Sequence, residues 1–95
     1  MEDAQLPAGW SLQQIRDRSG DGQATALNTD RRVTYGAVGD LPEETLLPEI
    51  VLGFHDLAIV KAIGDDDWYM GSLNDDGSIV CWSAYTELAE ALRGL

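Results

Sequence analysis

The sequence predicts one small α+β domain over residues 1–95, in which an antiparallel sheet of four to five strands carries an N-terminal and a C-terminal helix. Three observations predict it: a capped helical segment near the N-terminus, two strand-like runs joined by an Asp-Gly turn, and an apolar helical stripe at the C-terminus. Hydrophobic residues make up 44% of the chain and charged residues 24%, which is ordinary for a folded domain.

The first helix is predicted over residues 11–18. Ser11 and Gln14 fit a capping box, in which each side chain bonds the backbone of the other residue. Trp10 and Ile15 have the spacing of a hydrophobic staple, so Trp10 is interpreted as a structural anchor. The run of Ser, Gly, Asp and Gly at residues 19–22 ends the helix.

Residues 23–28 and 32–38 are predicted to be two strands around a turn at Thr29 and Asp30. Alternation of apolar with polar or small residues from Val33 onward is typical of a half-buried strand. Residues 39–44 are expected to form a loop that leads into a short helical turn. Asp40 would cap that turn, and glutamates would lie at its positive end.

Residues 49–63 are dense in apolar side chains, so periodicity does not separate helix from buried strand. Their β-branched residues favour a strand or loop up to Phe54 and a strand over residues 57–63, with a break at His55 and Asp56. This second strand would pair with the run at residues 68–73 and so begin a three-stranded meander.

The clearest strands are residues 68–73 and 78–84, because the turn between them ends in Asp76-Gly77. The expected register pairs Leu73 with Val80, Gly71 with Trp82 and Tyr69 with Ala84. Both faces of this hairpin would be apolar, so we expect it to be covered on both sides, with the Trp82 ring over Gly71. One predicted face holds Tyr69, Leu73, Val80 and Trp82, and the other holds Trp68, Met70, Ile79, Cys81 and Tyr85.

The last helix is predicted over residues 86–93 with Thr86 as its N-cap. Its apolar stripe can pack on the sheet, and consists of Leu88, Ala91, Leu92 and Leu95.

Charge is the strongest global feature: 17 acids face six basic residues, for a net charge of −11. Binding to a nucleic acid backbone needs a basic surface, so neither nucleic acid nor an anionic membrane is expected as a partner. A basic protein partner would be attracted and steered. The alternative is that the acidity only keeps the protein soluble.

The compartment is predicted to be cytoplasmic. The first seven residues hold two acids and no basic residue, unlike a signal peptide. No apolar run reaches the length of a membrane span. A single cysteine fits a reducing environment.

Two acidic clusters, Asp65-Asp66-Asp67 and Asp75-Asp76, flank the strand at residues 68–73. At about 3.3 Å per residue the clusters lie roughly 20 Å apart, so they do not share one metal ion. Neither cluster has the spacing of a calcium loop, and no metal or cofactor is predicted.

The first cluster leaves two interpretations open. Its carboxylates could be stabilised by the start of the last helix. Alternatively, with Trp68 and Tyr69 at its edge, it could be a patch that recognises a basic protein surface.

Catalysis has little support in the sequence, and the protein is predicted not to be an enzyme. The chain has one histidine, next to Asp56, and one cysteine, Cys81, within a predicted strand. Cys81 is interpreted as a buried packing residue, and a dyad of Cys81 with His55 stays as an alternative. The glycines lack the spacing of a phosphate-binding loop.

Residues 65–95 resemble small acidic bacterial proteins of the immunity type, which pair with polymorphic or contact-dependent toxins. The resemblance is carried by Asp-Trp-Tyr-Met-Gly-Ser-Leu at residues 67–73, Asp-Gly-Ser-Ile at residues 76–79, and by Trp82, Tyr85 and Leu88. It implies stoichiometric inhibition of a toxin, often a basic nuclease, through an acidic surface. It covers a third of the chain and assigns no named family.

The leading functional hypothesis is therefore a non-enzymatic protein-binding module, an inhibitor or immunity protein that masks a basic partner. The alternative is a small cytoplasmic housekeeping or stress-related protein that forms homodimers through an exposed sheet edge. The candidate partner-binding residues are Asp65, Asp66, Asp67, Trp68, Tyr69, Asp75 and Asp76.

Overall fold

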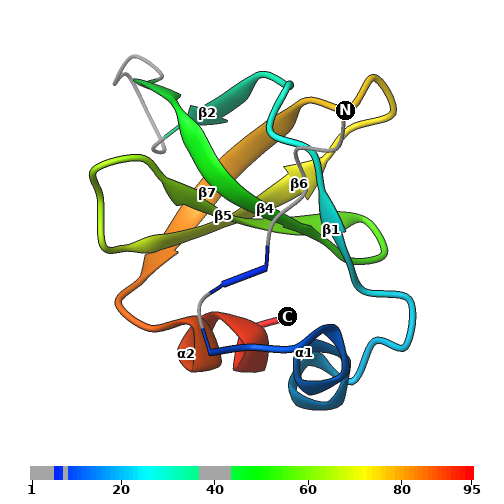
Figure 1. Ribbon diagram of the computed structural model, residues 1–95. Helices are drawn as coiled ribbons and strands as arrows, with labels where there is room; N and C mark the ends of the chain where they lie inside the picture. Colours follow the sequence, from blue (N-terminus) through cyan, green and yellow to red (C-terminus); the bar gives the residue numbers. More distant parts are fainter. Residues whose placement is uncertain (1–5, 8, 37–43) are drawn as a thin grey trace.

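The computed structural model describes residues 6–7, 9–36 and 44–95, and this part of the chain forms a curled, seven-stranded mixed sheet with two short helices against one face (Figure 1). Neither described helix is long and apolar enough to cross a membrane. The elements in chain order are α1 (Leu12–Ser19), β1 (Thr25–Leu27), β2 (Val33–Tyr35), β3 (Glu44–Leu46), β4 (Pro48–Gly53), β5 (Leu57–Ala62), β6 (Trp68–Leu73), β7 (Ile79–Tyr85) and α2 (Leu88–Arg93).

The prediction of an antiparallel sheet with four to five strands is wrong. Over the described residues the strand order is β1-β4-β5-β6-β7-β2-β3, and β2 runs parallel to β7. The two early strands do not form a hairpin with each other: β1 pairs with β4, whereas β2 lies between β7 and β3. Both are three residues long and pair with distant segments, and local alternation carries no information about such partners.

The expected helical turn before Pro48 is also absent from the described residues. Asp40 lies outside them, and Glu44–Leu46 is the edge strand β3. Leu47 alone separates β3 from β4, although β3 is at one edge of the sheet and β4 is next to the other edge. The sheet must therefore curl into a half-barrel that brings its two edges toward each other, as Figure 1 shows.

Several local predictions are confirmed. The Ser11 Oγ accepts the Gln14 N–H at 3.2 Å while the Gln14 side chain accepts the Ser11 N–H at 2.8 Å, which is the predicted capping box. Strands β4 and β5 break at residues 54–56, and β5, β6 and β7 form the expected antiparallel meander. The last helix begins later than predicted, with Glu87 as its N-cap, and the Thr86 hydroxyl donates to Glu90 instead.

The β6–β7 register is only partly as expected. Tyr69 pairs with Ala84 as predicted, but Leu73 pairs with Ile79 and Gly71 with Cys81, because Trp82 is an extra residue in a β-bulge. The predicted sorting of β7 side chains between the two faces is therefore wrong around the bulge.

Gly71 is covered by backbone and not by the Trp82 ring. A Cβ atom at Gly71 would collide with the Val80 carbonyl oxygen and the Cys81 Cα, so only glycine fits there. The Trp82 side chain is 46% exposed, and its indole N–H donates to the Ser72 hydroxyl at 3.3 Å.

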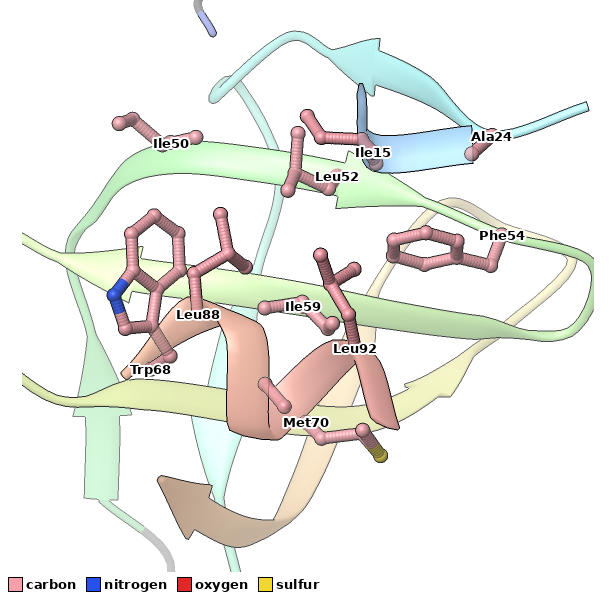
Figure 2. Close-up of a cluster of buried hydrophobic side chains, with 11 residues drawn as sticks. Ile15, Ala24, Ile50, Leu52, Phe54, Ile59, Trp68, Met70, Leu88 and Leu92 are labelled. Atoms are coloured by element: carbon pink, nitrogen blue, oxygen red, sulfur yellow. The ribbon is translucent and has the colours of Figure 1, made fainter. Parts of the chain in front are cut away.

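Each face of the sheet buries its own apolar cluster, as expected for a hairpin that is apolar on both sides. The cluster under the helices joins both helices to β4, β5 and β6, and includes Ile15, Leu52, Ile59, Met70, Leu88 and Leu92 (Figure 2). The cluster inside the curl includes Val33, Val51, Val60, Ile79 and Cys81. The short helices thus depend on packing for their stability, since isolated helices of this length are marginal in water.

Candidate functional site

The turn between β5 and β6 is held together by Asp65. Its backbone N–H donates to the Ala62 carbonyl at 3.2 Å, and its carboxylate accepts the Asp67 N–H at 3.0 Å. The same carboxylate accepts the Tyr69 hydroxyl at 2.5 Å. The hydrogen bond from the Tyr69 hydroxyl lowers the pKa of Asp65 most, and the hydrogen bond from the Asp67 N–H lowers it further. Asp65 is therefore a structural member of the acidic cluster.

Three acidic side chains gather around the Tyr69 phenol. The hydrogen bond to Asp65 raises the pKa of Tyr69 most, followed by burial, and the negative charges of Asp67 and Glu44 add to the shift. Glu44 reaches this place because it pairs with Tyr35 across β2 and β3, and the Tyr35 ring meets the Tyr69 ring edge-on at 5.2 Å. Strand β3 thus brings a distant glutamate to the aspartate turn.

An exposed apolar pair lies close to these acids along the chain, since Leu47 is three residues after Glu44 and Ile63 is two residues before Asp65. The Ile63 N–H donates to the Leu47 carbonyl at 2.7 Å, which places the two residues side by side. Leu47 is 66% exposed and Ile63 is 61% exposed. Exposed apolar residues that adjoin one another are typical of binding surfaces when a polar rim surrounds them.

We use the name acidic end for this surface, which consists of Glu44, Asp65, Asp66 and Asp67 with the apolar pair Leu47 and Ile63. No hydrogen bond joins the carboxylates of Glu44, Asp66 or Asp67 to other residues within the described part of the chain. The described residues thus leave these three carboxylates without hydrogen bonds, whereas the Asp65 carboxylate accepts two.

The structure separates the seven residues predicted from the sequence. Asp65, Asp66 and Asp67 belong to the acidic end, and the Tyr69 hydroxyl is bonded to Asp65 there. Trp68 points to the other face of β6, because successive strand residues alternate, and it is only 8% exposed within the cluster under the helices. Trp68 is therefore a core residue, and the prediction that it lies at the exposed edge of the patch is wrong.

Asp75 and Asp76 lie at the opposite end of β6, which spans six residues or roughly 20 Å. The Asp76 carboxylate accepts the Ser78 N–H at 2.9 Å and the Ser78 hydroxyl at 2.6 Å. The hydrogen bond from the Ser78 hydroxyl lowers the pKa of Asp76 most, followed by the hydrogen bond from the Ser78 backbone N–H. Asp76 thus holds the turn of the hairpin.

The turn at Asp75 and Asp76 has positively charged as well as negatively charged side chains beside it. The Arg31 guanidinium donates to the Gly77 carbonyl at 2.8 Å, and Arg31 and Arg32 share a pocket of about 550 Å³ with Asp30 and Asp76. Acids and cations alternate there, so Asp75 and Asp76 are less suited to attract a basic surface than the acidic end is.

Sequence reasoning missed Glu44, Leu47 and Ile63. The sequence pattern predicts that Glu44 belongs to a helical turn, and the aspartates of the acidic end, Asp65–Asp67, are more than 20 residues further along the chain. Leu47 gave no local signal. Ile63 gave a weak one, since it continues the apolar run of β5 up to the turn residues Gly64 and Asp65.

His55 and Cys81 do not form a dyad. His55 is exposed on the turn between β4 and β5, and its backbone N–H donates to the Asp21 carboxylate at 3.0 Å. Cys81 is fully buried on β7, three strands away from β4, and burial raises the pKa of its thiol to about 12. A buried, protonated thiol is a poor nucleophile. Within the described ranges, no three His, Cys, Asp or Glu side chains are grouped to hold a metal ion.

Comparison of the chain with protein-family models, curated proteins and solved structures found no match.

Proposed function

We propose that this protein is a non-enzymatic protein-binding module that masks a basic partner through its acidic end. The observation that carries the proposal is the exposed, adjoining pair Leu47 and Ile63, which lies close along the chain to acids whose carboxylates accept no hydrogen bond from the described residues: Glu44, Asp66 and Asp67. Binding energy at protein interfaces is concentrated in a few apolar or aromatic anchors, and the surrounding polar rim excludes water and selects the partner.

Charge supports the same conclusion. A net charge of −11 steers positively charged proteins toward the chain and raises their rate of association. The rim acids Glu44, Asp66 and Asp67 would then face Lys and Arg side chains, while Leu47 and Ile63 enter apolar depressions on the partner. In its most concrete form, the module is a stoichiometric inhibitor of the immunity type, which occludes a basic active site and performs no chemistry itself.

The test is affinity capture from lysate of the source cell with three forms of the protein. The wild type is compared with Glu44→Gln/Asp66→Asn/Asp67→Asn, which leaves the structural Asp65 in place. A charge-matched control, Asp17→Asn/Asp30→Asn/Asp56→Asn, removes three exposed carboxylates elsewhere. Bound proteins are identified by mass spectrometry after washes at low and high salt.

The proposal requires that one basic partner is captured in stoichiometric amount and is released at high salt. The control should still bind this partner, and Glu44→Gln/Asp66→Asn/Asp67→Asn, which we call the rim variant, should not. Leu47→Ser/Ile63→Ser should lose the same partner at all salt concentrations. A partner that binds the rim variant as well as the wild type would refute the acidic end as the site. A wild type that is a stable dimer by light scattering, with a dimer broken by Leu47→Ser/Ile63→Ser, would assign the apolar pair to self-association instead.

A further inference from the structure

Two tyrosines form a contact across the curl of the sheet. Tyr35 lies on β2 and Tyr69 on β6, with β7 between these strands, and both side chains pack against the cluster inside the curl. Their ring centroids are 5.2 Å apart and the ring planes are inclined by 62°. Aromatic pairs prefer such an edge-on arrangement. The contact therefore links two strands that do not pair with each other.

Each ring is also tied to one part of the acidic end. The Tyr69 hydroxyl donates to the Asp65 carboxylate at 2.5 Å, on the turn between β5 and β6. Tyr35 is directly opposite Glu44 in the antiparallel pair of β2 and β3. Side chains that are opposite in such a pair leave the sheet on the same face, with their Cβ atoms about 5 Å apart. A path of contacts thus runs from the aspartate turn through both rings to Glu44.

These contacts gather like charges around one hydroxyl group. The hydrogen bond to Asp65 raises the pKa of Tyr69 most, burial raises it further, and the negative charges of Asp65, Asp67 and Glu44 add to the shift. Carboxylates that lie this close to one phenol also repel one another. Glu44 therefore stays beside the turn only if other contacts hold it there.

No ion pair offsets this repulsion. All six Lys and Arg side chains of the chain belong to described residues, and the one ion pair among these residues joins Lys61 to Glu49 at 3.3 Å. Lys61 also lowers the pKa of Asp65, but the hydrogen bonds from Tyr69 and Asp67 lower it more. Like charges that are brought together without counter-ions cost stability, and such a cost is typical of functional sites.

We propose that Tyr35 and Tyr69 are positioning residues of the acidic end, because their contact holds Glu44 beside the aspartate turn against the repulsion of like charges. The inference deepens the proposed function and rests on it for its purpose, since a basic partner meets one combined pattern of charges only while the two rings touch. Tyr35 acts through Glu44, so loosening the ring contact should weaken the partner without removing any charge.

The test is a double-mutant cycle on stability, which needs no partner. Glu44→Gln removes one of the repelling charges and should raise the urea midpoint at about 10 mM salt. The gain should shrink at about 1 M salt, where charges more than about 3 Å apart are screened. The matched control is Glu49→Gln, which removes the same charge from the ion pair with Lys61 and should not raise the midpoint.

The tyrosine variants show whether the rings hold Glu44. Tyr35→Phe keeps the ring, so Glu44→Gln should give the same gain as in the wild type. Tyr35→Leu removes the edge-on contact, and the gain should disappear. Tyr35→Val, which suits a strand, is made in parallel in case the leucine variant does not fold. A full gain in either folded variant would show that Tyr35 has only a structural role and would overturn the proposal. A wild type that gains nothing from Glu44→Gln would overturn it as well.

Affinity capture separates failure of this inference from failure of the proposed function. If both hold, Tyr35→Leu should retain about two- to fivefold less partner than the wild type, and Tyr35→Phe should retain as much as the wild type. A partner that is lost by the rim variant but kept in full by Tyr35→Leu would overturn the positioning role and leave the acidic end as the site. The expected cycle, together with a partner that ignores the rim acids, would do the reverse.

Discussion

The phenolic hydroxyl of Tyr69 donates a 2.5 Å hydrogen bond to the carboxylate of Asp65, four residues earlier in the chain. This bond ties the start of β6 to the turn before it. It also distinguishes Asp65, whose carboxylate stabilises the turn, from Asp66 and Asp67, whose carboxylates accept no hydrogen bond from the described residues.

Tyr69→Phe should lower stability at neutral pH, and the loss should disappear in acid. The Tyr69 hydroxyl lowers the pKa of Asp65 in the folded state, so the bond stabilises the fold above the ordinary pKa of 3.8. That stability is lost as the pH falls through the lowered pKa. Urea midpoints of wild type and variant between pH 7 and pH 2 should therefore converge. Tyr35→Phe is the control, and a difference for Tyr69→Phe that is the same at every pH would contradict this account.

Cys81 should resist thiol reagents in the folded protein. Its side chain is fully buried and its thiol pKa is raised to about 12, so the thiolate is scarce at pH 8. The reaction with Ellman's reagent should proceed only as fast as the protein unfolds, and should become immediate in concentrated urea. Rapid labelling without urea would contradict this expectation and show that the cluster inside the curl opens readily.

Gly71→Ala should destabilise the fold by about 3 kcal/mol, toward the upper end of the cost of overpacking. The added methyl meets the Val80 carbonyl and the Cys81 Cα, and backbone atoms within a sheet do not move aside easily. Gly22→Ala is the control, because no atom lies within 4 Å of a Cβ at that position, and it should be close to neutral. Urea unfolding followed by circular dichroism measures both, and equal midpoints would rule out the close contact.

Two leucines should respond in opposite ways. Leu52 is fully buried under the helices, so Leu52→Ala should cost about 2–5 kcal/mol of stability. Leu47 is 66% exposed, so Leu47→Ala should change stability by less than about 0.5 kcal/mol. If the acidic end is the binding site, Leu47→Ala should nevertheless weaken the partner. A large stability loss for Leu47→Ala would mean that this residue serves the fold and not binding.

The sequence indicated the elements whose signals are local. The capping box of Ser11 and Gln14, the turn at Asp76-Gly77 and the break around His55 each depend on neighbours within a few residues, and the structure has all three. The bulge at Trp82 was not foreseen, because alternation assumes that every strand residue has an opposite partner. One extra residue was enough to reassign the faces of β7.

The topology was missed for a different reason. Strands β1, β2 and β3 are each three residues long; β1 and β2 pair with the distant strands β4 and β7, and β3 is placed only by its pairing with β2. The candidate site shares this limit. Its aspartates stood out as a run, whereas Glu44 and Leu47 join them only because β3 lies where it does. The part of the acidic end that depends on non-local pairing could not be read from the sequence.

The single-residue joint at Leu47 has a consequence for the order in which the chain folds. The meander of β5, β6 and β7 needs only short loops, whereas β2 must close a long loop to lie beside β7. Non-local closure of this kind carries an entropic cost before any contact rewards it, and it slows folding. Once β2 has paired with β7 and β3 with β2, the single residue Leu47 connects β3 to β4 and so brings the two edges of the sheet close together. We therefore expect the closing of the curl, and not the formation of the hairpins, to set the folding rate.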